Sequence, residues 1–180
     1  MILISAGHNP LAKGASYNSH NEHDEAVLWA EDVVNLIRPR LPVETVPTGH
    51  VNEKIKWINA QPKVHLICEI HFNSDESKRQ SGSETLYCPG SLIGRAVADV
   101  VQATLGGVFP PSRGAKEGWY RGDRGGGIII ALLEKTIRPA IIVEPEFIYN
   151  WEVLQSRRKA ACAALAKSLI EAATNITGEA

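Results

Sequence analysis

Two polar residues close a short apolar stretch near the middle of the chain, and their types make them candidates for chemistry. Residues 66–70 are apolar except for Glu69, which is typical of an inner strand of a parallel sheet. His71 and Asn73 follow at its carboxyl end, where open α/β sheets bind their ligands. Period-two alternation puts Glu69 on the same face as His71. A histidine at a strand end is most often structural, so a functional role requires partners elsewhere.

The same pattern occurs at two other predicted strands. Residues 2–4 are apolar and break into a glycine turn that carries His8, and residues 140–143 are apolar and end in Glu144. A carboxylate that emerges from an apolar strand is costly unless it is solvated, paired or bound to a metal. Because parallel strands bring their carboxyl ends to one edge, we expect His8, His71 and Glu144 to meet there.

A helix after the first loop supplies further carboxylates. Asn21 is a suitable N-cap, and apolar residues recur at helical spacing over residues 26–37 until Pro39. Glu22 and Glu25 fall in the first turn, where glutamate ordinarily serves the cap and the helix dipole. Either residue can return to the edge that carries the histidines, and Glu25 is the rival to Glu22.

These residue types indicate a metal-dependent hydrolase. Two imidazoles and one carboxylate are a ligand set of catalytic zinc, which keeps a fourth position for water or substrate. Zinc lowers the pKa of that water, and a second carboxylate can take its proton during attack on a carbonyl carbon. Composition and spacing leave the substrate open.

The elements that must position these residues alternate along the chain. Residues 43–46 and 83–88 predict strands, and residues 51–60 predict a helix. Further helices are expected after Ser91 and from Trp151 onward. The alternation predicts an α/β three-layer sandwich, with a mostly parallel sheet of about six strands flanked by helices.

Residues 106–127 are the least regular part of the sequence. They contain Pro110-Pro111 and end in a glycine-rich stretch, but they lack the GxxxxGK[ST] pattern of a phosphate loop, and a strand follows the glycines instead of preceding them. Nucleotide binding is therefore disfavoured. We expect a flexible, cationic and aromatic rim to a cleft, followed at residues 128–133 by a strand or a strand leading into a short helical turn.

Composition disfavours several classes of partner. The chain has 180 residues, 44% of them hydrophobic, which suits a single catalytic domain over residues 1–180. A net charge of -1 gives no overall attraction to nucleic acid or anionic lipid, and the amino-terminal apolar run is too short for a signal peptide or membrane insertion. Cys68, Cys88 and Cys162 form no CxxC pair, so neither disulfides nor a cysteine zinc site is expected. We expect a monomer made in the cytoplasm.

Short motifs in a particular order carry a family resemblance through nearly all of the chain. They are Gly7-His8, Gly14-Ala15, Asn21-Glu22, Ile70-His71-Phe72-Asn73, residues 82–87, Arg113-Gly114-Ala115-Lys116, and residues 139–144 followed by Phe147 and Asn150. Each is weak alone, but their order and spacing are specific. Together they resemble the zinc-dependent N-acetylmuramoyl-L-alanine amidases of bacterial cell-wall remodelling enzymes and phage endolysins.

The resemblance implies roles for four residues. It implies one zinc ion per chain with ligands His8, Glu22 and His71, and it implies Glu144 as the catalytic carboxylate. The implied substrate is peptidoglycan or a muropeptide, cut at the amide between the lactyl group of N-acetylmuramic acid and L-alanine. Such an enzyme acts on the cell wall, and the absence of an export signal fits release through a phage-made membrane lesion or a cytoplasmic recycling role.

The sequence departs from the family pattern at two places. Pro145-Glu146 stands where many relatives have a small residue and glycine, and Glu69 stands where many have serine. We hypothesise that Glu69 orients the metal-bound His71, a common arrangement for histidine ligands, with Asn73 also among the residues around the site.

The irregular segment supplies the predicted substrate groove. Arg113 and Lys116 would meet carboxylates of the peptide, and Trp119 and Tyr120 could stack on sugars.

Three other functions remain open. The first is a zinc peptidase that cuts stem peptides, and the second is a non-catalytic wall-binding module with the same fold. The third is a glycosidase that uses Glu69 and Glu144 and ignores chelators.

Overall fold

A six-stranded sheet forms the centre of the molecule. The computed structural model describes residues 1–121 and 127–178, and the strand order within them is β4-β1-β5-β10-β6-β7. The strands are β1 Ile2–Ala6, β4 Val43–Thr45, β5 Leu66–Ile70, β6 Ser83–Tyr87, β7 Ser112–Glu117 and β10 Ala140–Glu144. Neighbouring strands are parallel except for the antiparallel pair β10 and β6. The predicted α/β class and mostly parallel sheet are confirmed.

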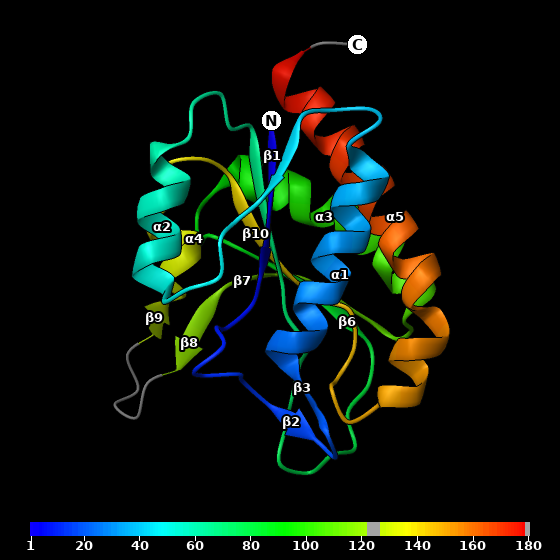
Figure 1. Cartoon of the computed structure of the whole chain (residues 1–180). Coiled ribbons are helices and arrows are strands. Elements are labelled where there is room, and N and C mark those ends of the chain that lie inside the picture. The colour runs from blue at the N-terminus through cyan, green and yellow to red at the C-terminus, as the bar shows by residue number, and fades with distance from the viewer. Residues whose placement is uncertain (122–126, 179–180) are drawn as a thin grey trace.

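Helices cover both faces of this sheet (Figure 1). One face carries α1 Glu22–Ile37, α3 Leu92–Val108 and α5 Trp151–Thr177, and the other carries α2 Val51–Ala60 and α4 Ala131–Lys135. The architecture is the three-layer sandwich expected from the alternation of strands and helices.

Side-chain alternation along the strands divides the interior into two apolar clusters. Ile2 and Ile4 of β1 point to the larger cluster under α1, α3 and α5, whereas Leu3 points to the smaller cluster under α2 and α4. On the smaller side, the next residues toward the carboxyl ends of β1 and β5 are Ser5 and Glu69, and β10 ends there in Glu144. The smaller apolar cluster therefore gives way to polar side chains at the carboxyl edge of the sheet.

Local signals set the starts of three helices. The side chain of Asn21 accepts a hydrogen bond from the backbone N–H of Asp24, and Ser91 caps α3 through Gly94 in the same way. His50 and Glu53 form a reciprocal capping box at the start of α2. The cap at Asn21 fixes Glu22 as the first residue of α1.

Two segments without a predicted strand contain strands. The loop before α1 includes a short hairpin of β2 Ser16–Tyr17 and β3 His20–Asn21. Residues 106–127 contribute the sheet strand β7, and β8 Trp119–Arg121 pairs with β9 Gly127–Ile129. The expectation of irregular backbone was wrong for β7 because this edge strand is half-exposed and polar and leaves no apolar run in the sequence. Gly125 and Gly126 of the glycine-rich stretch lie outside the described residues.

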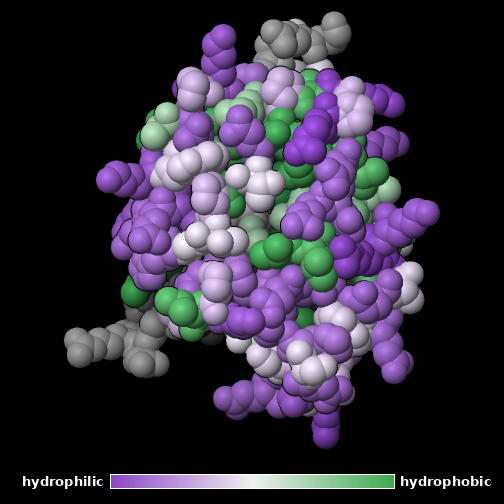
Figure 2. Space-filling view, in the orientation of Figure 1, coloured by the Kyte–Doolittle hydropathy of each residue, from purple (hydrophilic) through white to green (hydrophobic). Residues whose placement is uncertain are grey.

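One face of the molecule is largely polar. The face shown in Figure 2 is covered mainly by hydrophilic residues, with hydrophobic ones in small groups between them. None of the helices in the described part of the chain combines the length and apolar character that a membrane span needs.

Candidate metal centre

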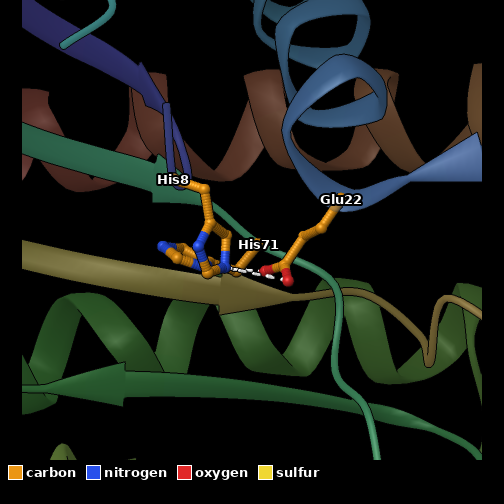
Figure 3. A group of neighbouring side chains, drawn as sticks. All are labelled: His8, Glu22 and His71. Atoms are coloured by element: carbon orange, nitrogen blue, oxygen red, sulfur yellow. Dashed lines mark hydrogen bonds and ion pairs between the residues drawn. The ribbon is translucent and has the colours of Figure 1, made fainter. Parts of the chain in front are cut away.

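The three predicted metal ligands meet at the carboxyl edge of the sheet (Figure 3). Nε2 of His8 lies 2.9 Å from Oε2 of Glu22, and Nδ1 of His71 lies 2.8 Å from Oε1 of the same carboxylate. One ligand atom from each residue lies within 4.8 Å of the other two. Residues distant in sequence thus present two nitrogens and one oxygen to a common point.

Backbone contacts hold the two histidines close together. The N–H of His71 donates to the carbonyl of Val143 at 2.9 Å, which continues the pairing of β5 with β10. The N–H of Gly7 donates to the carbonyl of Ile70 at 2.8 Å, so His8 leaves β1 beside His71. His8 itself has a positive φ of 57°, a backbone conformation that turns the chain sharply after the strand.

Two glycines leave the room that these side chains occupy. A Cβ atom at Gly14 would lie 2.5 Å from Nε2 of His8 and 2.6 Å from Oε2 of Glu22, and the φ of Gly14 is +75°. A Cβ atom at Gly7 would lie 2.7 Å from Cε1 of His71. The ligand cluster therefore requires glycine at both positions, because real Cβ contacts are longer than these.

Glu22 is ionised and fixed by donors on every side. Burial opposes its ionisation, but hydrogen bonds from His71 and His8 lower the pKa of Glu22 to about 2. Backbone N–H groups of Ala15 and Phe72 also donate to its two oxygens, each at 3.2 Å. The carboxylate is thus charged over the ordinary pH range and set in one orientation.

Glu69 lies on the other side of the His71 ring. Its Oε1 is 3.0 Å from Nε2 of His71, and its Oε2 accepts a hydrogen bond from Ser5 at 2.6 Å. Burial opposes the ionisation of Glu69, but contact with His71 and the charge of Lys54 lower its pKa to about 2. Burial also opposes charge on His71, but hydrogen bonds to Glu22 and Glu69 raise its pKa well above the usual value. Each ring nitrogen of His71 therefore faces one carboxylate oxygen, Nδ1 that of Glu22 and Nε2 that of Glu69.

Glu144 ends β10 next to this cluster, since its neighbour Val143 pairs with Ile70 of β5. Its Oε2 is buried and has no hydrogen-bond partner among the described residues. Burial raises the pKa of Glu144 to about 8, and nearby carboxylates act in the same direction, while the charge on His71 opposes them. A buried carboxyl oxygen without a partner among the described residues, next to three ligand-type side chains, makes Glu144 a candidate functional group.

A cleft of about 790 Å³ opens over these residues. The polar side includes His8, Glu22, His71 and Glu144. The cleft also has an apolar part from β9, α4 and the residue between them, which consists of Ile128, Ile129, Ile130, Ala131 and Leu132.

Comparison with known proteins decides the family. The family model described as N-acetylmuramoyl-L-alanine amidase matches residues 2–175. This chain belongs to that amidase family. Membership makes it an enzyme that acts on peptidoglycan of the cell wall. A comparison with curated protein sequences found no match.

Solved structures share the amidase fold. An N-acetylmuramoyl-L-alanine amidase from Clostridium difficile 630 superposes with a TM-score of 0.79 at 18% identity, covering 99% of this chain and 96% of that one. The catalytic domain of CwlV from Bacillus (Paenibacillus) polymyxa var. colistinus gives 0.77 at 20% identity, with 98% and 97% covered. The catalytic domain of the CD27L endolysin, which targets Clostridia difficile, gives 0.73 at 24% identity, with 97% and 96% covered.

The residues predicted to form the substrate groove of the amidase lie in different surroundings. Tyr120 lines the cleft and is 66% exposed. Trp119 is half-exposed, does not line the described cleft, and donates from its ring to Glu117 at 3.0 Å.

Arg113 and Lys116 of the amidase are paired with a residue that sequence reasoning missed. Both cations donate to Oε2 of Glu84, at 2.8 Å and 2.7 Å, and Asn73 donates to Oε1 at 2.8 Å. Glu84 stands opposite Glu144 in the antiparallel pair of β6 and β10. Glu84 lies within the family motif of residues 82–87, and this was the feature of the sequence that could have identified it. The two cations are therefore partly neutralised, and the contact of Asn73 is with Glu84 and not with a ligand.

Two other carboxylates of the amidase serve packing. Glu25, the rival to Glu22, accepts hydrogen bonds from Trp29 at 2.9 Å and from Gln155 at 2.7 Å. Glu146 accepts from the backbone of Gly82 at 3.0 Å and from Asn150 at 3.0 Å, which pins the loop after β10. Neither is turned to the three ligand-type side chains.

Lys54 was also missed by sequence reasoning. It lies on the buried side of α2, with 4% of its surface exposed, and its Nζ is 3.1 Å from Oε2 of Glu69. The sequence could have revealed Lys54, because the spacing of Ile55 and Ile58 predicts an apolar residue at this position of the helix.

Proposed function

We propose that this amidase is zinc-dependent and hydrolyses the amide between N-acetylmuramic acid and L-alanine, with Glu144 as general base. His8, Glu22 and His71 would hold the ion. The observation that carries the proposal is the convergence of these three side chains beside a buried carboxyl oxygen that lacks a partner.

The donor set fits zinc in type and charge. Zinc sites of hydrolases commonly use two imidazole nitrogens and one carboxylate oxygen. In the metal-free arrangement, protons on the histidines satisfy Glu22, and His71 carries a raised pKa for this reason. A divalent ion would replace those protons as the positive partner of Glu22, so binding should release protons. The space left by Gly7 and Gly14 supports the same assignment.

A bound zinc ion would supply Lewis acidity, which lowers the pKa of water and stabilises negative charge on a carbonyl oxygen. Glu144 would accept the proton of the attacking water and deliver it to the departing amide nitrogen. Its raised pKa of about 8 makes it able to hold that proton, and added positive charge nearby lowers the pKa toward the working range. Glu69 would keep the ring of His71 oriented through the contact at Nε2.

The cleft gives the substrate two different walls. The scissile amide would lie on the polar wall by Glu144, while aliphatic groups of the substrate would contact the apolar wall from β9 and α4. Tyr120 at the rim would contact the sugar chain, with Trp119 beside it in β8. Arg113 and Lys116 carry two positive charges, and Glu84 neutralises one of them. The remaining positive charge would attract carboxylates of the stem peptide.

The test is digestion of purified peptidoglycan with mass spectrometry of the products. The expected products are peptides that begin with L-alanine and glycan strands of unchanged length. Metal analysis should find one zinc per chain in the wild type and in Glu144→Gln, but little in His8→Ala. Both variants should be inactive. His65→Ala is the matched control, because His65 contacts the amino terminus at the other end of β5.

Other products would select other functions. Cleavage within the stem peptide would indicate a zinc peptidase, and new reducing ends would indicate a glycosidase. Full activity after exhaustive EDTA treatment would overturn the zinc proposal. Unchanged activity of Arg113→Gln and Lys116→Gln on intact cell walls would remove those residues from the substrate groove.

A further inference from the structure

Lys54 is a buried cation that stability alone does not explain. Only 4% of its surface is exposed, and its helical neighbours Ile55 and Ile58 are also buried. Lysine is almost never fully buried without a partner. Here the ammonium donates to the carbonyl of Ala6 and contacts Glu69. Replacing such a buried pair with apolar residues is often neutral or stabilising, so its presence calls for another reason.

The contacts of Glu69 explain why Lys54 is there. The two carboxylate oxygens of Glu69 have different partners. Oε2 receives Lys54 at 3.1 Å and Ser5 at 2.6 Å, from α2 and β1 respectively. Oε1 is left for Nε2 of His71 at 3.0 Å. With Oε2 clamped on two sides, the carboxylate can rotate little, and the Nε2–H of His71 has a fixed acceptor.

The fixed acceptor decides which nitrogen of His71 faces the other ligands. When Nε2 carries the proton for Glu69, Nδ1 is the atom directed at the point shared with Glu22 and His8. We propose that Lys54 is a positioning residue: together with Ser5 it clamps Glu69, so that His71 presents Nδ1 to the metal ion.

This proposal extends the metal site to α2, an element that contributes none of the three ligands. Lys54 lines the cleft, but its hydrogen bonds go to Ala6 and Glu69 and not to a ligand, so it acts on the ligands through Glu69. The proposal rests on the proposed function only in taking His8, Glu22 and His71 as the zinc ligands.

The direct test is zinc affinity measured by competition with a chromogenic chelator. Loss of an outer partner of a metal ligand typically weakens binding by about 10 to 100-fold, and we expect Lys54→Met to fall in that range. Lys56→Met is the matched control, because Lys56 is exposed on the same helix and should bind zinc as the wild type does. Urea unfolding of the metal-free proteins establishes that each variant is folded.

A double-mutant cycle with Glu69→Gln separates positioning from general support of the fold. We expect Glu69→Gln to weaken zinc binding about as much as Lys54→Met does. Adding Lys54→Met to Glu69→Gln should then change affinity by less than about 3-fold, because the residue through which Lys54 acts is already altered. The double variant also removes both charges, so it tests the proposal even where Lys54→Met alone unfolds. Additive losses would overturn it.

NMR can test directly whether the Nε2–H of the His71 ring is held by Glu69. In zinc-loaded wild type the Nε2–H of His71 should give a protected proton resonance in NMR, because it is held by Glu69. The resonance should exchange faster with water in Ser5→Ala and be lost in Lys54→Met, but persist in Lys56→Met. An unchanged resonance and unchanged zinc affinity in Lys54→Met would refute the positioning role.

The outcomes also separate this proposal from the proposed function. Zinc binding that depends on Lys54 without release of L-alanine peptides would support the positioning role and reject the substrate. Wild-type zinc binding and cleavage that ignore Lys54 would reject the positioning role alone. A wild type that binds no zinc would reject both.

Discussion

Replacing Glu144 with glutamine should change how the stability of the metal-free protein depends on pH. The ordinary pKa of this carboxyl is 4.5, and in the folded protein it is raised to about 8. The neutral form is therefore favoured by folding. The associated stability is fully present below pH 4.5 and is lost as the pH rises toward 8, because the unfolded chain releases this proton more readily.

The magnitude follows from the size of the pKa shift. Each pH unit between the two pKa values costs about 1.4 kcal/mol of unfolding free energy. From pH 5 to pH 7.5 the wild type should lose at most about 3 kcal/mol relative to Glu144→Gln. Since the side chain of Glu144 lines an open cleft, water screens part of its electrostatic interactions. We therefore expect a difference in unfolding free energy of roughly 1 to 3 kcal/mol between the two proteins.

Urea unfolding at pH 5 and pH 7.5, after removal of metal, measures this difference. Glutamine keeps the size of the protonated side chain but does not titrate, and groups distant from the site titrate equally in both proteins. Glu152→Gln, at an exposed position of α5, is the matched control and should follow the wild type. Saturating zinc should reduce the difference, because a positive ion favours the carboxylate.

Parallel stability curves for the wild type and Glu144→Gln would refute the reasoning. They would mean that Glu144 is solvated or paired in solution, so that neither its burial nor the surrounding carboxylates hold the proton. A difference of the opposite sign would mean that the folded protein favours the ionised form.

Two further substitutions test the geometry of the site. Gly14→Ala should lower zinc affinity about 10-fold or more and stability by roughly 1 to 3 kcal/mol, since the new Cβ would lie 2.5 Å from Nε2 of His8 at a positive φ. Chelator competition and urea unfolding measure both effects, and Gly107→Ala, where a Cβ meets nothing within 4 Å, should show neither loss. Glu25→Gln should keep zinc and turnover but lose about 1 kcal/mol, because Trp29 would donate to a neutral acceptor. Loss of zinc from Glu25→Gln would contradict the assignment of that residue to packing.

Sequence patterns were sufficient for the elements that carry the ligands. The apolar runs before His8 and His71 predicted β1 and β5, and the cap at Asn21 predicted where α1 begins. These are local signals, since strand burial and helix capping depend on a few neighbouring residues. The parallel order of the strands then required the polar residues after them to share one edge.

The sequence failed where a segment had no local signature. Strand β7 is half-exposed and polar, and it is a strand because β6 offers it an edge to pair with. The partners of the predicted cations were likewise hidden, because Glu84 meets Arg113 and Lys116 only through the pairing of β6 and β7. Pairing between distant segments decides such contacts, and spacing along the chain does not report it.

What the sequence by itself determined is the set of strand ends, the first helix and the family, because burial, capping and motif order are written in consecutive residues. Only the tertiary structure decided which role each glutamate carboxylate has. Glu22 faces two imidazoles while Glu25, one turn away, faces Trp29. Lys54 reaches Glu69 only because α2 packs over β5. A carboxylate takes its role from the groups that surround it in space, and folding alone assembles those groups.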